Sequence, residues 1–288
     1  MRLGFIGFGE VGFEISCGVK QEGLAEIYAF DPLMNDANFG KLVNDRAREA
    51  GVRLLDTVDA VTMQADVIIA ATPGGKALQA AQSAVEALAT GKIYADVSTS
   101  TAATKKKIAE IVEAKGATFV DGAMMGGLSM QHHKVPTLVS GSGSDEFIRR
   151  LSPYGMVLTK VSDNAGDAIA IKLVRSIAMK GLASLAVETL EAAVKLGVES
   201  LVLKSIAGTL TSAPFDENLD WLVTASAIHA KRQVHEMQDV MKMMREIGVE
   251  PTMTEATTKR LEWLDSKNYP ERFQGKKPKT WKEAATAW

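Results

Sequence analysis

The chain has 288 residues, a formal net charge of −2 and a single cysteine, Cys17. This length is typical of two domains, and the charge provides no basic field for nucleic acid or an anionic membrane. One cysteine excludes an internal disulfide, and we expect Cys17 to be a small buried thiol. Every apolar run is shorter than a membrane span, and the first strand begins too early to leave room for a signal peptide. We therefore expect a cytoplasmic protein with no nucleic-acid or membrane partner.

The first thirty residues predict a strand, a glycine turn, a helix and a second strand. Apolar runs at 3–6 and 27–30 flank the sequence GFGEVG at 7–12, and the second run ends at Asp31. In such a unit the glycines allow a tight turn, close approach of a pyrophosphate and close packing of helix on strand. The N–H groups at the start of the helix suit the phosphates. We therefore expect a dinucleotide site here.

Asp31 also discriminates between cofactors. A carboxylate at the end of the second strand accepts the ribose hydroxyls of NAD and repels a 2′-phosphate. Pro32 follows directly, and no arginine stands in the next ten residues. NAD is therefore favoured over NADP.

Six further apolar runs predict strands at 52–55, 66–71, 92–97, 117–120, 135–140 and 156–161. Helices are expected at 76–90, 104–115 and 145–151, with a helix or an irregular connection at 35–50. The carboxyl ends of parallel strands share one edge of a sheet, where the ligand binds. We therefore expect the residues that follow these strands to lie beside the cofactor. The predicted cofactor-binding residues are Gly7, Phe8, Gly9, Glu10, Val11, Gly12, Asp31, Thr72 and Pro73.

Strand signals stop near residue 163, and helices are expected at 164–197, 201–209, 217–247 with a possible break, and 254–264. The predicted fold class is α/β, with a Rossmann-type, doubly wound, mostly parallel sheet followed by an all-helical C-terminal domain. We place the dinucleotide-binding domain at 1–162 and the helical domain at 163–288. In the polar tail we expect Trp281 and Trp288 to pack on the body or on a second subunit, while the nearby lysines stay solvated.

The helix at 164–197 carries apolar residues on almost every face, which predicts a buried helix. Lys172 lies within it, and Ser176 shares its face at i+4. A solvated lysine is the ordinary alternative, but the apolar neighbours argue against it. Burial and nearby positive charge favour the neutral form of an amine, which suits proton transfer. Lys172 is therefore the best candidate for moving a hydroxyl proton during hydride transfer.

Histidines give weaker signals. In the helix at 217–247, Val234, Met237, Met241 and Met244 form a predicted core stripe, and His235 lies on the opposite, polar side. That side is either a solvated face with an Arg232–Glu236 pair or a functional one. His132 and His133 have no ligand spacing and no neighbouring carboxylate or cysteine cluster, so no metal site is expected.

Four motifs together resemble the β-hydroxyacid dehydrogenase family, relatives of 6-phosphogluconate dehydrogenase. They are GFGEVG at 7–12, DVST at 96–99, DGAMMGG at 121–127 and GDAIAIK at 166–172, in the family's order and spacing. The resemblance covers nearly the whole chain. The sequences HKVPTLVSG and EMQDVMKMMREIGVEPTMTEAT are closer to a less characterised branch with a distinctive C-terminal domain.

The resemblance implies a dinucleotide-binding domain joined by one long helix to an all-helical domain, a homodimer, and Lys172 as general acid/base. It places Ser98 and Thr99 near nicotinamide and substrate, the turn at Gly126 and Gly127 under the substrate carboxylate, and His235 at the cleft. Two positions depart from the family. Met125 replaces a usual serine and Ser176 a usual asparagine, and because both positions bind substrate, the substrate is left open.

The leading hypothesis is an NAD-dependent dehydrogenase that acts on a small polar hydroxy acid, either a 3-hydroxy acid or a sugar acid. Oxidation of a 3-hydroxy acid would give a β-keto acid able to decarboxylate or isomerise. One alternative is an imine reductase, which the lysine at position 172 disfavours because such relatives generally replace it. The other is a non-catalytic NAD-binding regulatory protein.

Overall fold

A computed structural model describes all residues from Met1 to Trp288. The chain forms two compact units, Met1–Ser176 and Ile177–Trp288, and the division falls inside helix α8, Asp167–Leu196. The predicted domain boundary, between residues 162 and 163, coincides with the end of strand β8, Leu158–Ser162; as a boundary between functional domains it stays a prediction. None of the helices combines the length and apolar character that a bilayer crossing requires.

The first unit contains one sheet of eight strands in the order β3-β2-β1-β4-β5-β6-β7-β8. All neighbouring strands pair in parallel except β6 and β7, which are antiparallel. The strand order from β3 to β6 is that of the doubly wound dinucleotide-binding fold, so the predicted fold class is confirmed. The strands are β1 Arg2–Ile6, β2 Glu26–Phe30, β3 Arg53–Leu54, β4 Val67–Ala70, β5 Ile93–Asp96, β6 Thr118–Met124, β7 Thr137–Ser140 and β8 Leu158–Ser162.

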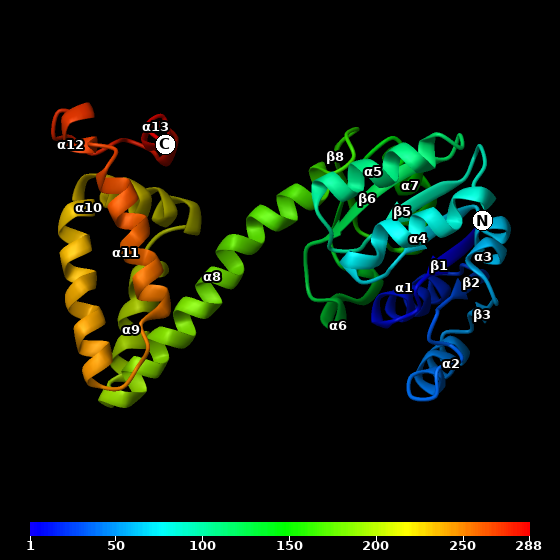
Figure 1. The fold of residues 1–288 in the computed structure, drawn as a ribbon, viewed down its shortest axis with the longest axis horizontal. Coiled ribbons are helices and arrows are strands. Elements are labelled where there is room, and N and C mark those ends of the chain that lie inside the picture. Colours follow the sequence, from blue (N-terminus) through cyan, green and yellow to red (C-terminus); the bar gives the residue numbers. More distant parts are fainter. The chain divides into compact units, whose positions relative to one another are not determined.

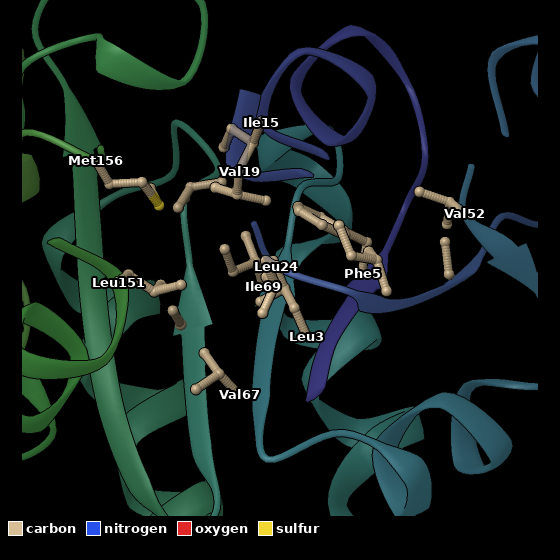
Figure 2. Packing of buried hydrophobic residues seen from close by; sticks show 14 of the residues in the cluster. Leu3, Phe5, Ile15, Val19, Leu24, Val52, Val67, Ile69, Leu151 and Met156 are labelled. Carbon is tan, nitrogen blue, oxygen red and sulfur yellow. The ribbon is translucent and has the colours of Figure 1, made fainter. Parts of the chain in front are cut away.

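The strands alternate their side chains between two apolar cores. Leu3 and Phe5 of β1 join one core, and Ile6 joins the other. Figure 2 shows the first core, in which strand residues gather with Ile15 and Val19 of α1. The second core is completed by the buried alanines of α4 and by Ile108 and Ala109 of α5. The sheet is therefore buried on both faces, as its continuous apolar strands require.

Helices and short 3₁₀ turns connect the strands. The helices are α1 Glu10–Gln21, α2 Gly40–Glu49, α3 Val58–Gln64, α4 Ala77–Ala84, α5 Ala102–Glu113, α6 Leu128–Gln131 and α7 Ser144–Leu151. The 3₁₀ turns are η1 Gly74–Lys76, η2 Val85–Ala87, η3 His132–Lys134 and η4 Ser152–Tyr154. The helix predicted at 76–90 is shorter than expected, because η2 ends it and Gly91, at a φ of +87°, turns the chain into β5. The strand predicted at 52–55 keeps only two residues.

The second unit is helical (Figure 1). After α8 come α9 Glu199–Leu210, α10 Phe215–Glu246, α11 Thr252–Asp265, α12 Tyr269–Arg272 and α13 Trp281–Ala285. Helices α10 and α11 pack side by side. The break considered in α10 does not occur. Its predicted core stripe is confirmed, since Val234 and Met244 are buried and Met237 and Met241 are half-buried.

The expectation that α8 is buried is wrong for this chain. Ala168 and Ile169 at its start are fully buried against the sheet, but the exposed fractions of Ile171, Val174 and Ile177 are 44%, 67% and 75%. Apolar residues on every face predict that something covers a helix, and they do not say whether the cover belongs to the same chain.

The C-terminal segment packs through different residues from those expected. Tyr269 is fully buried, and its hydroxyl donates to the carbonyl of Ala284 over 2.7 Å. Trp281 and Trp288 are exposed in this chain, so the first alternative, packing on the body, is wrong, while packing on a second subunit stays a prediction. The small side chains Ala284 and Ala287 form the contact with Tyr269 instead. Cys17 is half-buried, less than expected.

Candidate active site

The glycine turn after β1 brings backbone close to backbone. Gly7 has a φ of +87°, and a Cβ there would lie 2.7 Å from the carbonyl oxygen of Ala71. Its N–H donates to the carbonyl of Phe30 over 2.8 Å, which ties the turn to the end of β2. Gly9 precedes α1, no side chain caps the helix, and a Cβ at Gly9 would meet nothing within 4 Å. The start of α1 therefore offers N–H groups and open space to an anion.

Asp31 holds the backbone around this turn. One carboxylate oxygen accepts from the N–H of Phe8 over 2.7 Å, and the other accepts from the N–H of Leu33 over 2.8 Å. Only 7% of Asp31 is exposed. A carboxylate has about four acceptor positions, so two remain for ribose hydroxyls. Asp31 thus both orders the glycine turn and keeps acceptors for a ligand.

A cavity of about 610 Å³ lies between the turn, the loop after β2 and helix α4. Of the predicted cofactor-binding residues it includes Gly7, Gly9, Asp31, Thr72 and Pro73. Phe8 does not line the cavity, because its ring is buried against Phe5. Gly12 is buried beside Phe8, while Glu10 and Val11 form the first turn of α1. Sequence reasoning missed the remaining lining residues, which are Ile6, Phe30, Pro32, Leu33, Val58, Ala71, Lys76, Gln79, Ala80 and Ser83.

No sequence motif marks the lining residues that were missed. Val58, Gln79 and Ser83 lie on helices α3 and α4, whose positions over the strand ends follow from topology rather than from a motif. The cavity, the uncapped start of α1 and the open position at Gly9 together fit a dinucleotide: an apolar slot for a base, a carboxylate for a ribose and helix N–H groups for a pyrophosphate.

A second group of residues lies where β5 and β6 end. Thr99, in the loop after β5, accepts a hydrogen bond from Nζ of Lys172 over 3.2 Å. Ser98 is buried, and its hydroxyl donates to Asp96 over 3.1 Å. The hydroxyl of Ser176 donates to the carbonyl of Lys172 over 2.9 Å. The structure therefore brings Lys172 and Thr99 together. The hydroxyls of Ser98 and Ser176 donate to other groups of the chain.

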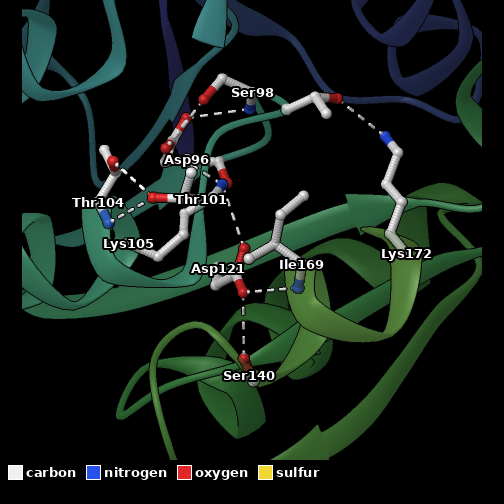
Figure 3. A network of polar contacts seen from close by, with 10 residues as sticks. Asp96, Ser98, Thr101, Thr104, Lys105, Asp121, Ser140, Ile169 and Lys172 are labelled. Atoms are coloured by element: carbon white, nitrogen blue, oxygen red, sulfur yellow. Dashed lines mark hydrogen bonds and ion pairs between the residues drawn. The ribbon is translucent and has the colours of Figure 1, made fainter. Parts of the chain in front are cut away.

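Beneath this pair lies a buried cation that sequence reasoning missed (Figure 3). Lys105 of α5 is fully buried, and its Nζ lies 3.1 Å from a carboxylate oxygen of Asp96 and 3.1 Å from one of Asp121. In the sequence Lys105 begins the run KKK at 105–107, which is typical of a solvated helix face. A usable signal was the presence of an aspartate in each of two neighbouring buried strands, because two buried carboxylates require a cation.

The loop after β6 carries the other predicted substrate residues. The N–H of Met125 donates to the carbonyl of Pro136 over 2.7 Å. A Cβ at Gly126 would lie 2.0 Å from the side-chain oxygen of Gln131, so the loop folds tightly on itself before Gly127 begins α6. This loop and Lys172 both belong to the unit Met1–Ser176.

The histidines after this loop contact α1. His132, at a φ of 49°, has its Nδ1 2.6 Å from a carboxylate oxygen of Glu14. His133 is buried beside Gly18, and burial lowers its pKa below the usual range, with Lys134 adding to the effect. No three His, Cys, Asp or Glu side chains lie close enough together to hold a metal ion.

His235 lies on α10 in the second unit and is exposed. The neighbouring pair predicted from the sequence, Arg232 and Glu236, is in contact. The role of His235 at the cleft stays a prediction.

Residues 2–168 match the family model described as the NAD binding domain of 6-phosphogluconate dehydrogenase, and the chain belongs to that family. Residues 193–264 match a second model, a domain of unknown function named DUF1932. The predicted family is thereby confirmed, and the first unit is an NAD(P)-binding domain. The second match agrees with the expectation of a branch with its own C-terminal domain.

Relatives extend over most of the chain. A 2-(hydroxymethyl)glutarate dehydrogenase of Eubacterium barkeri is 25% identical over 216 residues, which cover 72% of this chain and 68% of that protein. A solved conserved protein of unknown function, described as structurally similar to 3-hydroxyacid dehydrogenases, is 30% identical with a TM-score of 0.62. That match covers 96% of this chain and 100% of the other.

An imine reductase of Myxococcus stipitatus in complex with NADP⁺ shares the fold, with a TM-score of 0.73 and 16% identity over 92% of this chain and 94% of the other. A variant of that reductase has been solved with NAD⁺. The chain is therefore similar in fold to proteins solved with either cofactor.

Proposed function

We propose that this protein transfers a hydride between NAD and a small polar hydroxy acid, with Lys172 as the general acid/base. The observation that carries the proposal is the contact of Lys172 with Thr99 at the carboxyl end of β5, one strand from β4, whose following turn lines the cofactor cavity. An amine held at a fixed position beside the cofactor is what proton transfer from a substrate hydroxyl requires.

When bound, the nicotinamide supplies the hydride acceptor or donor. The chain's own groups divide the remaining work. Lys172 takes the hydroxyl proton during oxidation and returns it during reduction, while Thr99 orients the amine. The backbone at Gly126 and Gly127, together with Met125, lies under the substrate carboxylate. Because the hydroxyls of Ser98 and Ser176 are already bonded to the protein, we assign their positions to shaping the site.

Two similarities support the substrate class. The Eubacterium barkeri relative is named for oxidising a hydroxymethyl-substituted dicarboxylic acid, and the solved relative is described as similar to 3-hydroxyacid dehydrogenases. Both names point to small hydroxy acids that carry a carboxylate. A 3-hydroxy acid or a sugar acid is therefore the substrate class to test first.

The cofactor in this proposal is NAD. The support is Asp31, a largely buried carboxylate at the end of β2 that keeps two acceptor positions for ribose hydroxyls. A 2′-phosphate would bring a second negative charge against it. Lys76 lines the same cavity, and it is the one cation there that could offset such a charge.

The proposal includes a homodimer in the cytoplasm. Its support is the long apolar exposure of α8, which continues on α9 at Leu201, Leu203 and Ile206. Exposed apolar surface of this extent is typical of an interface, and a second copy with the same apolar helices is the natural cover. A chain with one cysteine needs no oxidising compartment.

Imine reduction is the second candidate, and the observation that favours it is the similarity of fold to the Myxococcus stipitatus reductase. Lys172 argues against it, because the imine-reducing relatives of this family generally replace that lysine. A non-catalytic NAD-binding role would leave Lys172 without a task.

The test is absorbance of reduced nicotinamide with purified protein, NAD or NADP, and a panel of 3-hydroxy acids, sugar acids and cyclic imines. Lys172→Ala should lose on the order of a hundredfold or more in kcat, whereas Lys180→Ala, an exposed lysine of the same helix, should turn over normally. Equal activity of wild type and Lys172→Ala would refute the assignment. Turnover of imines alone would favour the second candidate, and NAD binding without any turnover the regulatory one.

A further inference from the structure

Two aspartates face each other on neighbouring strands beneath the site. Asp96 of β5 and Asp121 of β6 are register partners in the parallel sheet, and both are fully buried. Like charges directly opposite one another destabilise a sheet, and burial makes the repulsion worse. Lys105 lies between them, and its ammonium contacts a carboxylate oxygen of each aspartate and the carbonyl of Asp96. The lysine therefore donates one hydrogen bond, to the carbonyl of Asp96, and forms an ion pair with each of the two carboxylates.

Each aspartate uses its remaining oxygen positions to hold one side of the candidate active site. Asp96 accepts from the N–H of Ser98 over 3.0 Å and from its hydroxyl over 3.1 Å. Ser98 directly precedes Thr99, whose hydroxyl oxygen accepts the hydrogen bond from Lys172. Asp96 thereby fixes the loop that presents Thr99.

Asp121 holds the other side. It accepts from the N–H of Ile169, in the first turn of α8, over 2.9 Å. The hydroxyl of Ser140 donates to Asp121 over 3.4 Å and accepts from the N–H of Ala168 over 3.0 Å. A carboxylate at the positive end of a helix is a favourable contact. The contact with Asp121 therefore holds the start of α8 in place, one turn before Lys172.

The contacts thus close a circuit. One half of this series of contacts leads from Lys172 to Thr99 and through Ser98 to Asp96. The other half leads from Asp96 across Lys105 to Asp121, and through Ile169 back along α8 to Lys172 (Figure 3). We infer that Lys105 is a positioning residue, which fixes the separation of Lys172 and Thr99 by bridging the two aspartates that hold them. Buried ionic groups are often no more stabilising than apolar packing of the same volume. Their contacts are directional, however, so they fix the relative positions of the groups that they join.

The inference deepens the proposed function, because it gives Lys172 a defined position for proton transfer. The test observes Lys172 directly and needs no substrate. Lysines of the full chain are methylated with ¹³C-formaldehyde, and the Lys172 signal is assigned as the one that Lys172→Arg removes. Lys105 is fully buried, so it contributes no signal of its own.

The critical variant is Lys105→Met, which keeps the length of the side chain and removes the cation. We expect the Lys172 signal to move to the position of the exposed lysines. The matched control is Lys92→Met: Lys92 is half-buried, donates to the carbonyls of Met63 and Ala65, and precedes β5 at the opposite end of that strand. This control should lose stability and leave the Lys172 signal unchanged. An unchanged signal in folded Lys105→Met would overturn the inference.

Removal of the cation leaves two buried carboxylates opposed, and the variant could fail to fold. Ser140→Ala then decides, because it removes one of the two connections between Asp121 and the start of α8, leaving the direct contact with the N–H of Ile169, and it keeps the charges in place. We expect a smaller movement of the Lys172 signal in the same direction, and an unmoved signal would again overturn the inference. The proposed function fails separately, if Lys172→Ala retains full turnover whatever the spectra show.

Discussion

Nζ of Lys172 donates to Oγ1 of Thr99 over 3.2 Å, although one residue lies on α8 and the other in the loop after β5. A hydrogen bond from a charged donor is worth about 1.5–3 kcal/mol. We expect Thr99→Val, which keeps the shape and removes the acceptor, to lower kcat by roughly ten- to a hundredfold while the dissociation constant of NAD stays within about twofold. Steady-state kinetics and cofactor titration measure the two quantities.

The matched control for this prediction is Thr104→Val on α5. The hydroxyl of Thr104 contacts that of Thr101, so its loss should leave kcat unchanged. A Thr99→Val enzyme as fast as wild type would show that the contact does not serve proton transfer.

Asp31→Asn should change the choice of cofactor. The substitution removes the negative charge and keeps an acceptor for only one of the two backbone N–H groups, those of Phe8 and Leu33, because the amide NH₂ cannot accept from the other. We expect NAD to bind about tenfold more weakly, the equivalent of about 1.4 kcal/mol, while the binding of NADP is unchanged or improved. Fluorescence titration of both cofactors gives the ratio. Asp36→Asn, an exposed residue of the same loop, is the control, and an unaltered ratio in Asp31→Asn would contradict the role of Asp31.

Gly18→Ala should destabilise the first unit in spite of the higher helix propensity of alanine. A Cβ at Gly18 of α1 would lie 1.7 Å from Nδ1 of His133, inside the imidazole ring. Such overpacking costs about 1–3 kcal/mol. Urea unfolding should detect the loss, and His133→Ala combined with Gly18→Ala should recover most of it, because the ring is then absent. Additive losses in the double variant would mean that the two residues do not compete for space.

Glu188 should make stability dependent on pH. Its carboxylate, on α8, accepts from the hydroxyl of Thr254 and from the N–H groups of Met253 and Thr254 at the start of α11. Burial raises the pKa of Glu188, but these hydrogen bonds lower it more, so its pKa lies below the usual range. A depressed acid pKa stabilises the fold above the pKa of the unfolded chain, about 4.3, and this contribution disappears as pH falls through the folded value.

Glu188→Gln should therefore cost about 1–2 kcal/mol at pH 7, as the loss of a charged cap does. The difference from wild type should shrink steadily below about pH 4.3. Urea unfolding at several pH values measures it, with Glu191→Gln, an exposed neighbour on α8, as the control. A difference that is constant from pH 7 to pH 3 would exclude the carboxylate as its source.

Local sequence was sufficient for the cofactor unit. The turn at Gly7 and Gly9, the two apolar runs around it and Asp31 specify one supersecondary unit whose residues are all within thirty positions of each other. The buried strands were also predicted, because their short continuous apolar runs have the length and the flanking residues that distinguish a strand from a buried helix segment.

The burial of Lys105 and the exposure of apolar residues on α8 could not be predicted from local sequence. Lys105 is followed by two exposed lysines, and only the register of β5 on β6 places Asp96 and Asp121 on either side of it. Ile171 and Val174 have the composition of core residues, yet both are exposed in this chain. In each case the surroundings of the residue depend on tertiary structure, which a local sequence pattern does not contain.

The two backbone contacts of Asp31 have a consequence for the rate at which a cofactor is captured. The N–H groups of Phe8 and Leu33 are held by a carboxylate of the chain itself, so the protein's own contacts order the glycine turn. Association then loses little backbone entropy on the protein side. A cofactor that reaches the site by diffusion meets a turn that is already ordered, so rearrangement of the loop need not limit the association rate.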